Sequence, residues 1–239
     1  MSGSDETRLA VAADFIVRTF MCARPGEQLI ITADTATDPR AVQALLEAAR
    51  LARTRAAVLT IPQLPFQGAL ADPFVPEPIG PAVKSCDVWL DLTFPYLGGS
   101  KVHADAMAAN RVRCLMFHDL DAGGVARLYA GVEFDRLFDL QEAIDAVVTR
   151  SVGRTCRVTN AAGTDVSFTI GRPATRKIRR VDAPGTYTPP GSAVIYPELA
   201  SVRGRVVVDA TFHEYFTLLN ERIDLAVDGP IRAISAGRS

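Results

Sequence analysis

The chain of 239 residues is 48% hydrophobic and 22% charged, with a formal net charge of −1. These proportions are typical of a globular protein with ample core material, and the length predicts one or two domains. A charge this close to zero gives no reason to expect a nucleic acid or an anionic membrane as a partner. No apolar run approaches the roughly 18 residues that a membrane-spanning helix needs.

The cysteines and the first residues indicate the compartment. Cys22, Cys86, Cys114 and Cys156 form no CxxC pair, and three of them lie in or beside apolar segments. This is typical of reduced, buried thiols. The polar and acidic start, MSGSDETRLA, does not resemble a signal peptide. We therefore expect a cytoplasmic protein.

In chain order, the first 150 residues alternate between helix and strand patterns. A helix is expected at 5–21, and Asp38-Pro39 predicts the start of a second, because a capping side chain precedes a proline at the first helical position. Continuous apolar runs, typical of strands buried on both faces, occur at 29–31, 56–62, 88–94 and 111–117. Further helices are expected at 81–86, at 101–110 after a Ser100 cap, and at 133–150, with a long proline-rich candidate lid or binding loop at 63–80.

The pattern changes near Gly153. Residues 156–170 alternate around an Ala-Ala-Gly turn and predict a hairpin, residues 203–211 predict a strand, and residues 222–235 predict a second hairpin. The earlier alternation of strands with helices predicts a parallel sheet. We therefore predict an α/β fold, with a Rossmann-like, mostly parallel domain at 1–152 and a smaller antiparallel β domain at 153–239.

The turn ADTATD at 33–38 follows the first strand, where open α/β sheets usually bind ligands. It lacks glycine and carries two carboxylates, and no GxGxxG or GxxxxGK[ST] motif is present, so we expect no nucleotide cofactor. Asp34 and Thr35 are candidates for binding a polar substrate. In the alternative, Asp38 only caps the helix, while Asp34 and the threonines form local turn hydrogen bonds.

Two of the three histidines lie near the ends of predicted strands. His103 is early in the helix that follows a Gly-Gly pair, and His118 with Asp119 ends the strand at 111–117. Imidazole titrates near neutral pH, so His103 and His118 are candidate general acids or bases, and Asp119 is a candidate substrate-binding residue. The alternative is a surface histidine without a catalytic role. His213 begins HEYFT, which is not an HExxH zinc motif.

Several segments, taken in order, carry a family resemblance. They are ITADTATDPRAVQALLEAA, VLTIP, CDVWLDLTF, CRVTNAAGTDVSFTI, PPGSAVIYPELASVRGRVVVD and IDLAVDGPIRAI. The set resembles the amino-terminal part of the metallo-aminopeptidases T and S and of the related 2,5-dihydroxypyridine 5,6-dioxygenases. The resemblance implies the fold, a divalent metal (Zn, Co or Fe), a homodimer, and a small-molecule or peptide substrate. It also implies a histidine acid/base, which His103 matches.

The chain departs from this family pattern in two ways. Family members are longer, and most of their metal ligands lie in a carboxyl-terminal part beyond the matched segments. Ser192 also stands where the family pattern P-x-G-E-V has a ligand glutamate, and a hydroxyl is a poor substitute for a carboxylate on a divalent ion. Glu198 and His213 remain as candidate metal ligands.

The resemblance and the departures together lead to two expectations. The first is a truncated or diverged family member, either a metal-dependent aminopeptidase-like hydrolase or a ring-cleaving dioxygenase, that acts on a small polar substrate. The alternative is a non-catalytic small-molecule-binding or assembly module with the same fold.

Overall fold

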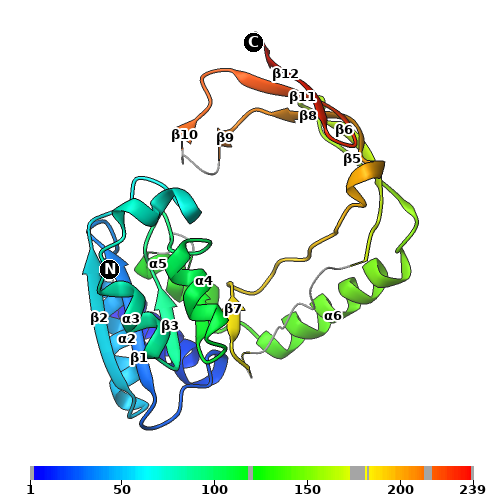
Figure 1. The fold of residues 1–239 in the computed structure, drawn as a ribbon. Helices are drawn as coiled ribbons and strands as arrows, with labels where there is room; N and C mark the ends of the chain where they lie inside the picture. The colour runs from blue at the N-terminus through cyan, green and yellow to red at the C-terminus, as the bar shows by residue number, and fades with distance from the viewer. Residues whose placement is uncertain (1–2, 118–120, 173–180, 182, 213–216, 238–239) are drawn as a thin grey trace. The chain divides into compact units, whose positions relative to one another are not determined.

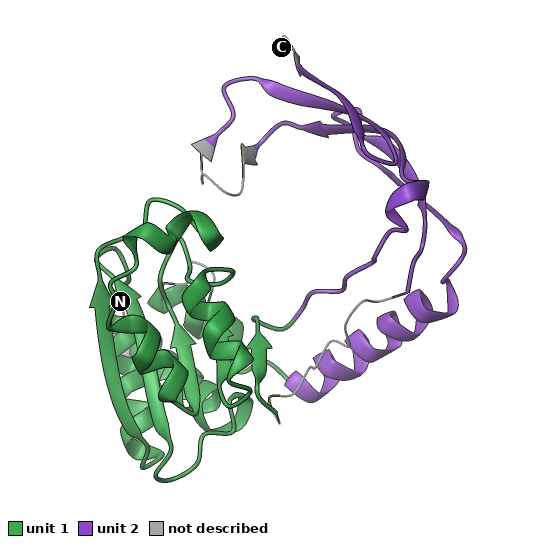
Figure 2. Ribbon diagram, in the orientation of Figure 1, with its two compact units in different colours: residues 1–133, 178–190 green, residues 134–177, 191–239 purple. Residues whose placement is uncertain are grey.

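The chain forms two compact units, which are described separately (Figure 2). The computed structural model describes residues 3–117, 121–172, 181, 183–212 and 217–237. Unit 1 comprises residues 1–133 and 178–190, and unit 2 comprises residues 134–177 and 191–239. The domain boundary expected at residue 152 stays a prediction.

Unit 1 is built on a five-stranded parallel sheet in the order β2–β1–β3–β4–β7 (Figure 1). All four residues of β3 are buried, which is why this strand reads as an apolar run up to Asp91. The strands are β1 (Gln28–Asp34), β2 (Arg55–Ile61), β3 (Val88–Asp91), β4 (Arg113–Met116) and β7 (Gly185–Tyr187).

Two groups of helices accompany this sheet. α3 and α4 contact each other, and their residues Val83 and Ala106 join a buried cluster around Trp89 and Cys114. α1, α2 and α5 contact one another in a second group. The helices of unit 1 are α1 (Gly3–Asp14) with the π-helical turn η1 (Phe15–Phe20), α2 (Pro39–Leu51), the 3₁₀ helix η2 (Gly68–Phe74), α3 (Ile79–Ser85), α4 (Lys101–Ala108) and α5 (Ala122–Tyr129).

The predicted start of α2 at Asp38-Pro39 is confirmed. Asp38 accepts a hydrogen bond from the backbone nitrogen of Arg40 at 3.0 Å and pairs with the Arg40 guanidinium at 2.7 Å. It also accepts from the backbone nitrogen of Ala122, in the first turn of α5, at 3.0 Å. These bonds, chiefly that of the Arg40 side chain, lower the pKa of Asp38 to about 2. One carboxylate therefore joins the amino ends of two helices.

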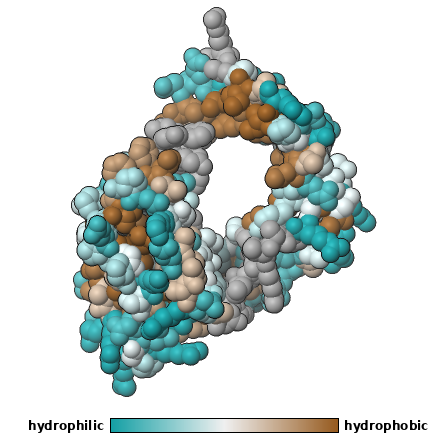
Figure 3. Space-filling view, viewed as in Figure 1, coloured by the Kyte–Doolittle hydropathy of each residue, from teal (hydrophilic) through white to brown (hydrophobic). Residues whose placement is uncertain are grey.

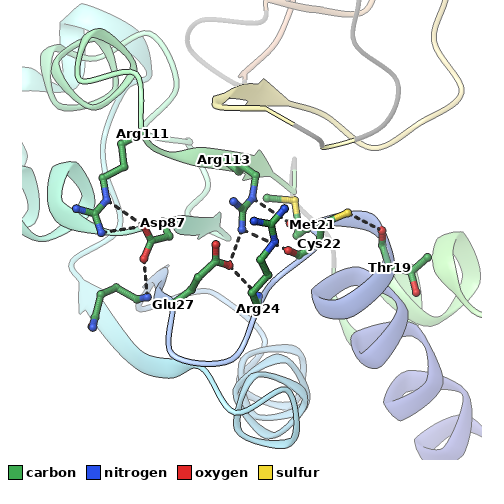
Figure 4. Close-up of polar contacts among 9 residues, drawn as sticks. Thr19, Met21, Cys22, Arg24, Glu27, Asp87, Arg111 and Arg113 are labelled. Atoms are coloured by element: carbon green, nitrogen blue, oxygen red, sulfur yellow. Dashed lines mark hydrogen bonds and ion pairs between the residues drawn. The ribbon is translucent and has the colours of Figure 1, made fainter.

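Charged side chains form ion pairs and hydrogen bonds at the amino-terminal edge of the parallel sheet (Figure 4). Arg113, at the start of β4, donates from Nη2 to Oε2 of Glu27 at 2.6 Å. The two side chains are only 13% and 18% exposed, so little water screens the pair. Asp87 accepts from Nε of Arg111 at 3.0 Å beside it. Structural contacts therefore occupy this edge, and the opposite, carboxyl-terminal edge is the place to look for a ligand site.

The carboxyl end of β3 carries a completely buried carboxylate, Asp91. Its Oδ1 accepts from the hydroxyls of Thr32 (2.8 Å) and Thr93 (2.7 Å) and from the backbone nitrogen of Thr93 (3.2 Å). Its Oδ2 accepts from the backbone nitrogen of Leu97 at 3.0 Å. Asp91 thus binds strand β1 and the loop that leads from β3 to α4. Burial raises the pKa of Asp91 to about 6, although the four donors oppose this shift.

Unit 2 contains one long helix and a five-stranded antiparallel sheet in the order β12–β11–β8–β6–β5. The hairpins predicted at 156–170 and 222–235 are confirmed as the pairs β5–β6 and β11–β12. The elements are α6 (Phe134–Arg150), β5 (Thr155–Thr159), β6 (Asp165–Thr169), the 3₁₀ turn η3 (Leu199–Ser201), β8 (Arg203–Val208), the short pair β9 (Thr211–Phe212) and β10 (Thr217–Leu218), β11 (Arg222–Asp228) and β12 (Ile231–Gly237).

The antiparallel sheet has one apolar and one polar face. The register pairs Val158 with Val166 across β5 and β6, and pairs Leu225 of β11 with both Val206 and Ile234, so apolar side chains share one face. Hydrophobic residues gather over this sheet in the space-filling view (Figure 3). The other face is held by ion pairs across strands, Arg157 with Asp165 at 2.7 Å and Arg205 with Asp224 at 2.6 Å.

The predicted α/β class, a parallel sheet followed by a separate antiparallel sheet, is confirmed. Strand β7 is not among the predicted strands; it follows the β5–β6 hairpin in the chain and yet pairs in parallel with β4. The loop expected at 63–80 contains the 3₁₀ helix η2. None of the described helices is both long enough and apolar enough to span a membrane.

Replacing Asp38 by alanine should destabilise the protein by about 1–2 kcal/mol, because the helix cap is lost together with the bond to Ala122. Asp38→Asn keeps a capping acceptor and should cost less. The pKa of Asp38 is lowered in the folded state, so the stabilisation by its charge is complete above pH ~4 and is lost as pH falls through about 2. Urea unfolding at pH 7 measures the stability of both variants, and equal losses of stability would contradict a capping role for Asp38.

The pH dependence of stability expected from Asp91 is opposite to that expected from Asp38. Its folded-state pKa is raised from 3.8 to about 6, so the stabilisation linked to its proton is complete below pH ~4 and is lost as pH rises through 6. Asp91→Asn cannot titrate, and its amide nitrogen would face donor groups. Its unfolding free energy should be lower than that of the wild type at pH 4, and the difference should shrink by pH 7. A difference that is constant from pH 4 to pH 7 would exclude this titration.

Candidate functional site

The carboxyl-terminal edge of the parallel sheet has its topological switch point between β1 and β3. From β1 the chain first adds β2 on one side and then returns to add β3 on the other side. Ligands of open α/β sheets usually bind at such a point. Asp34 ends β1 and Asp91 ends β3, so two buried carboxylates flank the switch point.

The contacts of Asp34 are those of a structural turn. Its Oδ1 accepts from the backbone nitrogens of Ala36 (2.7 Å) and Thr37 (3.0 Å), and its Oδ2 accepts from that of Phe94 at 2.6 Å. Asp34 is 4% exposed, whereas the neighbouring Thr35 is exposed and accepts from the backbone nitrogen of Gln63 at 3.2 Å. These bonds match the local-turn alternative, and substrate binding by Asp34 and Thr35 stays a prediction.

The segment at 63–80 docks on this edge. Nε2 of Gln63 donates to the carbonyl of Phe94 at 2.8 Å, and Asp72 of η2 accepts from the backbone nitrogen of Lys101 at 2.7 Å. Gly68 and Gly99 approach so closely that a Cβ on Gly99 would lie 3.4 Å from the Cα of Gly68. The candidate binding loop is therefore anchored to the first turn of α4.

His103 lies in this first turn, and both of its ring nitrogens are engaged. Ser100 caps α4 as predicted and accepts from the backbone nitrogen of His103 at 3.2 Å. The backbone N–H of Gly99 donates to Nδ1 at 3.3 Å, and Nε2 lies 2.8 Å from Oγ1 of Thr186 in β7. Because Nδ1 accepts, we assign the ring proton to Nε2, which then donates to Thr186.

The environment of His103 favours the neutral ring. Burial lowers the pKa of His103 from its ordinary 6.5. Its ring centre lies 6.1 Å from that of Trp89, which is fully buried and donates from Nε1 to the hydroxyl of Thr32 at 2.8 Å. At neutral pH, His103 is therefore a hydrogen-bond donor at Nε2. It can take up a proton only at Nδ1, if that nitrogen parts from Gly99.

The other predicted site residues lie outside the described part of the chain or belong to unit 2, so none of them is placed at this corner by the described part of unit 1. His118, Asp119 and His213 lie outside the described residues. Glu198 belongs to unit 2, where its side chain is exposed and its backbone nitrogen donates to the carbonyl of Thr169 at 2.9 Å. The catalytic role of His103 and His118 and the metal role of Glu198 and His213 stay predictions.

The described residues do not fit a metal centre. Among them, no group of three or more His, Cys, Asp or Glu side chains could hold an ion. Ser192, which stands in place of the family glutamate, is exposed, and its carbonyl accepts from Nε2 of Gln141 at 3.1 Å.

Two polar residues of this region, Asp91 and Thr186, are not among the predicted site residues. Asp91 could have been noticed, because a carboxylate within the apolar run VWLDLTF must find buried donors. Thr186 gave no signal, since β7 is only three residues long and precedes two prolines.

Comparisons with known proteins agree with this fold. The family model described as 2,5-dihydroxypyridine 5,6-dioxygenase matches residues 15–238. The structure of 2,5-dihydroxypyridine dioxygenase from Pseudomonas putida KT2440 is similar, with a TM-score of 0.66 and 20% identity, over 98% of this chain and 69% of that one. Wild-type AmpT from Thermus thermophilus has a TM-score of 0.60 and 14% identity, over 96% and 71%.

A search of curated proteins found no match. The two structural similarities show a shared fold, and they confirm the resemblance to both groups of enzymes. Because the family model covers nearly the whole chain, the protein belongs to the 2,5-dihydroxypyridine 5,6-dioxygenase family.

Proposed function

We propose that this protein is an enzyme that acts on a small hydroxylated aromatic ring, of which 2,5-dihydroxypyridine is the model. The family match over residues 15–238 carries this proposal, because it spans both units of the chain. The proposed reaction is the oxygen-dependent ring cleavage for which the family is named. We place the ring at the corner where the first turn of α4 meets β7, beside His103.

The polar groups of this corner suit such a substrate. His103 is neutral and half-buried, so it does not present a full charge to an aromatic ring. The corner also offers the hydroxyl of Thr186, 2.8 Å from the histidine. This pair of polar, uncharged groups supports a hydroxylated ring as ligand.

Two observations favour a second candidate, a small-molecule-binding module without catalysis. Ser192 replaces the carboxylate of the family pattern, and the described residues form no cluster of metal-ligating side chains. Enzymes of this family and aminopeptidases are generally metal-dependent. A binding module would keep the fold and the polar corner without the chemistry.

Purified protein supplied with Fe(II) and air should consume oxygen and 2,5-dihydroxypyridine together, followed with an oxygen electrode and by the loss of substrate absorbance. His103→Gln should lower the rate by about 10²-fold or more, the usual contribution of an acid or base. Leu-p-nitroanilide should remain intact. Binding of the pyridine without oxygen uptake would favour the non-catalytic module, and release of p-nitroaniline would indicate an aminopeptidase.

The protein as purified should carry less than one metal ion per chain, because Glu198 is an exposed carboxylate with no cluster of ligands among the described residues. Elemental analysis measures this, and Glu198→Ala should leave the metal content unchanged. Stoichiometric zinc, cobalt or iron that disappears in Glu198→Ala or His213→Ala would overturn the expectation and identify these residues as ligands.

A further inference from the structure

Thr186 reaches the candidate site from a distant part of the chain. It is the central residue of β7 and lies opposite Cys114 of β4 in the parallel register. In the sheet order β7 is the edge strand, and Thr186 is exposed. Its described side-chain contact is the one with Nε2 of His103, a residue 83 positions earlier.

The hydrogen atoms of this pair can be assigned one by one. The backbone N–H of Gly99 points at Nδ1 of His103, so Nδ1 carries no hydrogen and Nε2 carries one. The Nε2–H then donates to Oγ1 of Thr186, which must be the acceptor. A threonine hydroxyl has one hydrogen to donate, and none of the described residues accepts it.

We propose that Thr186 is a ligand-binding residue whose hydroxyl donates a hydrogen bond to a ring oxygen of the substrate. The proposal rests on the proposed function, since the ring oxygen is that of a hydroxylated pyridine. Besides its proposed acid/base role, His103 also positions Thr186, because its Nε2–H holds the hydroxyl oxygen and turns the hydroxyl hydrogen outwards. A chain of donors, N–H to O–H to ligand, strengthens each bond and favours an oxygen that carries negative charge.

A structural role for the same bond makes different predictions. If the bond between His103 and Thr186 only pinned β7 to α4, its loss would lower the stability and leave ligand affinity in the folded protein unchanged. Thr186→Val removes the hydroxyl and keeps the shape and the strand preference. Thr186→Ser restores the hydroxyl. Thr188→Val makes the same change two residues further on, just past the end of β7, and serves as the matched control.

The experiment measures the Kd of 2,5-dihydroxypyridine without oxygen by calorimetry, and KM and kcat with Fe(II) and air. Thr186→Val should raise Kd and KM about tenfold, the equivalent of one lost hydrogen bond, with a smaller change in kcat. Thr186→Ser and Thr188→Val should stay within about twofold of the wild type. Thermal unfolding of each variant reports any loss of fold.

Each outcome decides the proposal. An unchanged Kd in folded Thr186→Val would overturn it, and so would weak binding that Thr186→Ser fails to restore. If the wild type binds the pyridine without turnover and Thr186→Val loses binding, the proposed function fails while the role of Thr186 stands. If the wild type turns the pyridine over and Thr186→Val does so with the same KM, only the role of Thr186 fails. A wild type that does not bind the pyridine would overturn both.

Discussion

The buried carboxylate of Asp91 is the interaction on which the candidate site depends. It binds Thr32 of β1 and the backbone of Leu97, so it sets the path of the chain after β3. The backbone nitrogen of Ser100 then donates to the carbonyl of Leu97 at 3.1 Å, and Ser100 caps α4. His103 follows in the first turn. Removing a carboxylate from water is costly, and four donors offset part of that cost only when this loop is in place.

The loop between β3 and α4 is packed so closely that a larger residue would not fit at Gly98. A Cβ on Gly98 would collide with the sulfur of Met116 and with the ring of Tyr96. Gly99 has a φ of +80°, a backbone conformation that favours glycine, and its N–H is the group that fixes the tautomer of His103. The pair Gly98-Gly99 therefore has two roles. It allows the close turn, and the N–H of Gly99 donates the hydrogen bond to Nδ1 of His103.

Most of the fold could be predicted from local patterns. Apolar runs predict β1 to β4, and the caps at Asp38 and Ser100 predict the starts of α2 and α4, because these signals depend on neighbouring residues alone. The hydrogen bond between His103 and Thr186 depends on a three-residue strand, β7, that lies far from His103 in the sequence. A strand this short has no hydrophobic periodicity from which it could be predicted. The family membership could be predicted from ordered segments, whereas the residue that completes the candidate site could not.

The most direct test of this account is the protonation state of His103, read from a long-range ¹H–¹⁵N NMR spectrum at pH 7, with His103→Gln identifying the signals. The account predicts a neutral ring with the proton on Nε2, and a shift of these signals when 2,5-dihydroxypyridine is added. A charged imidazolium, a proton on Nδ1, or signals that stay unchanged at a saturating pyridine concentration would contradict it.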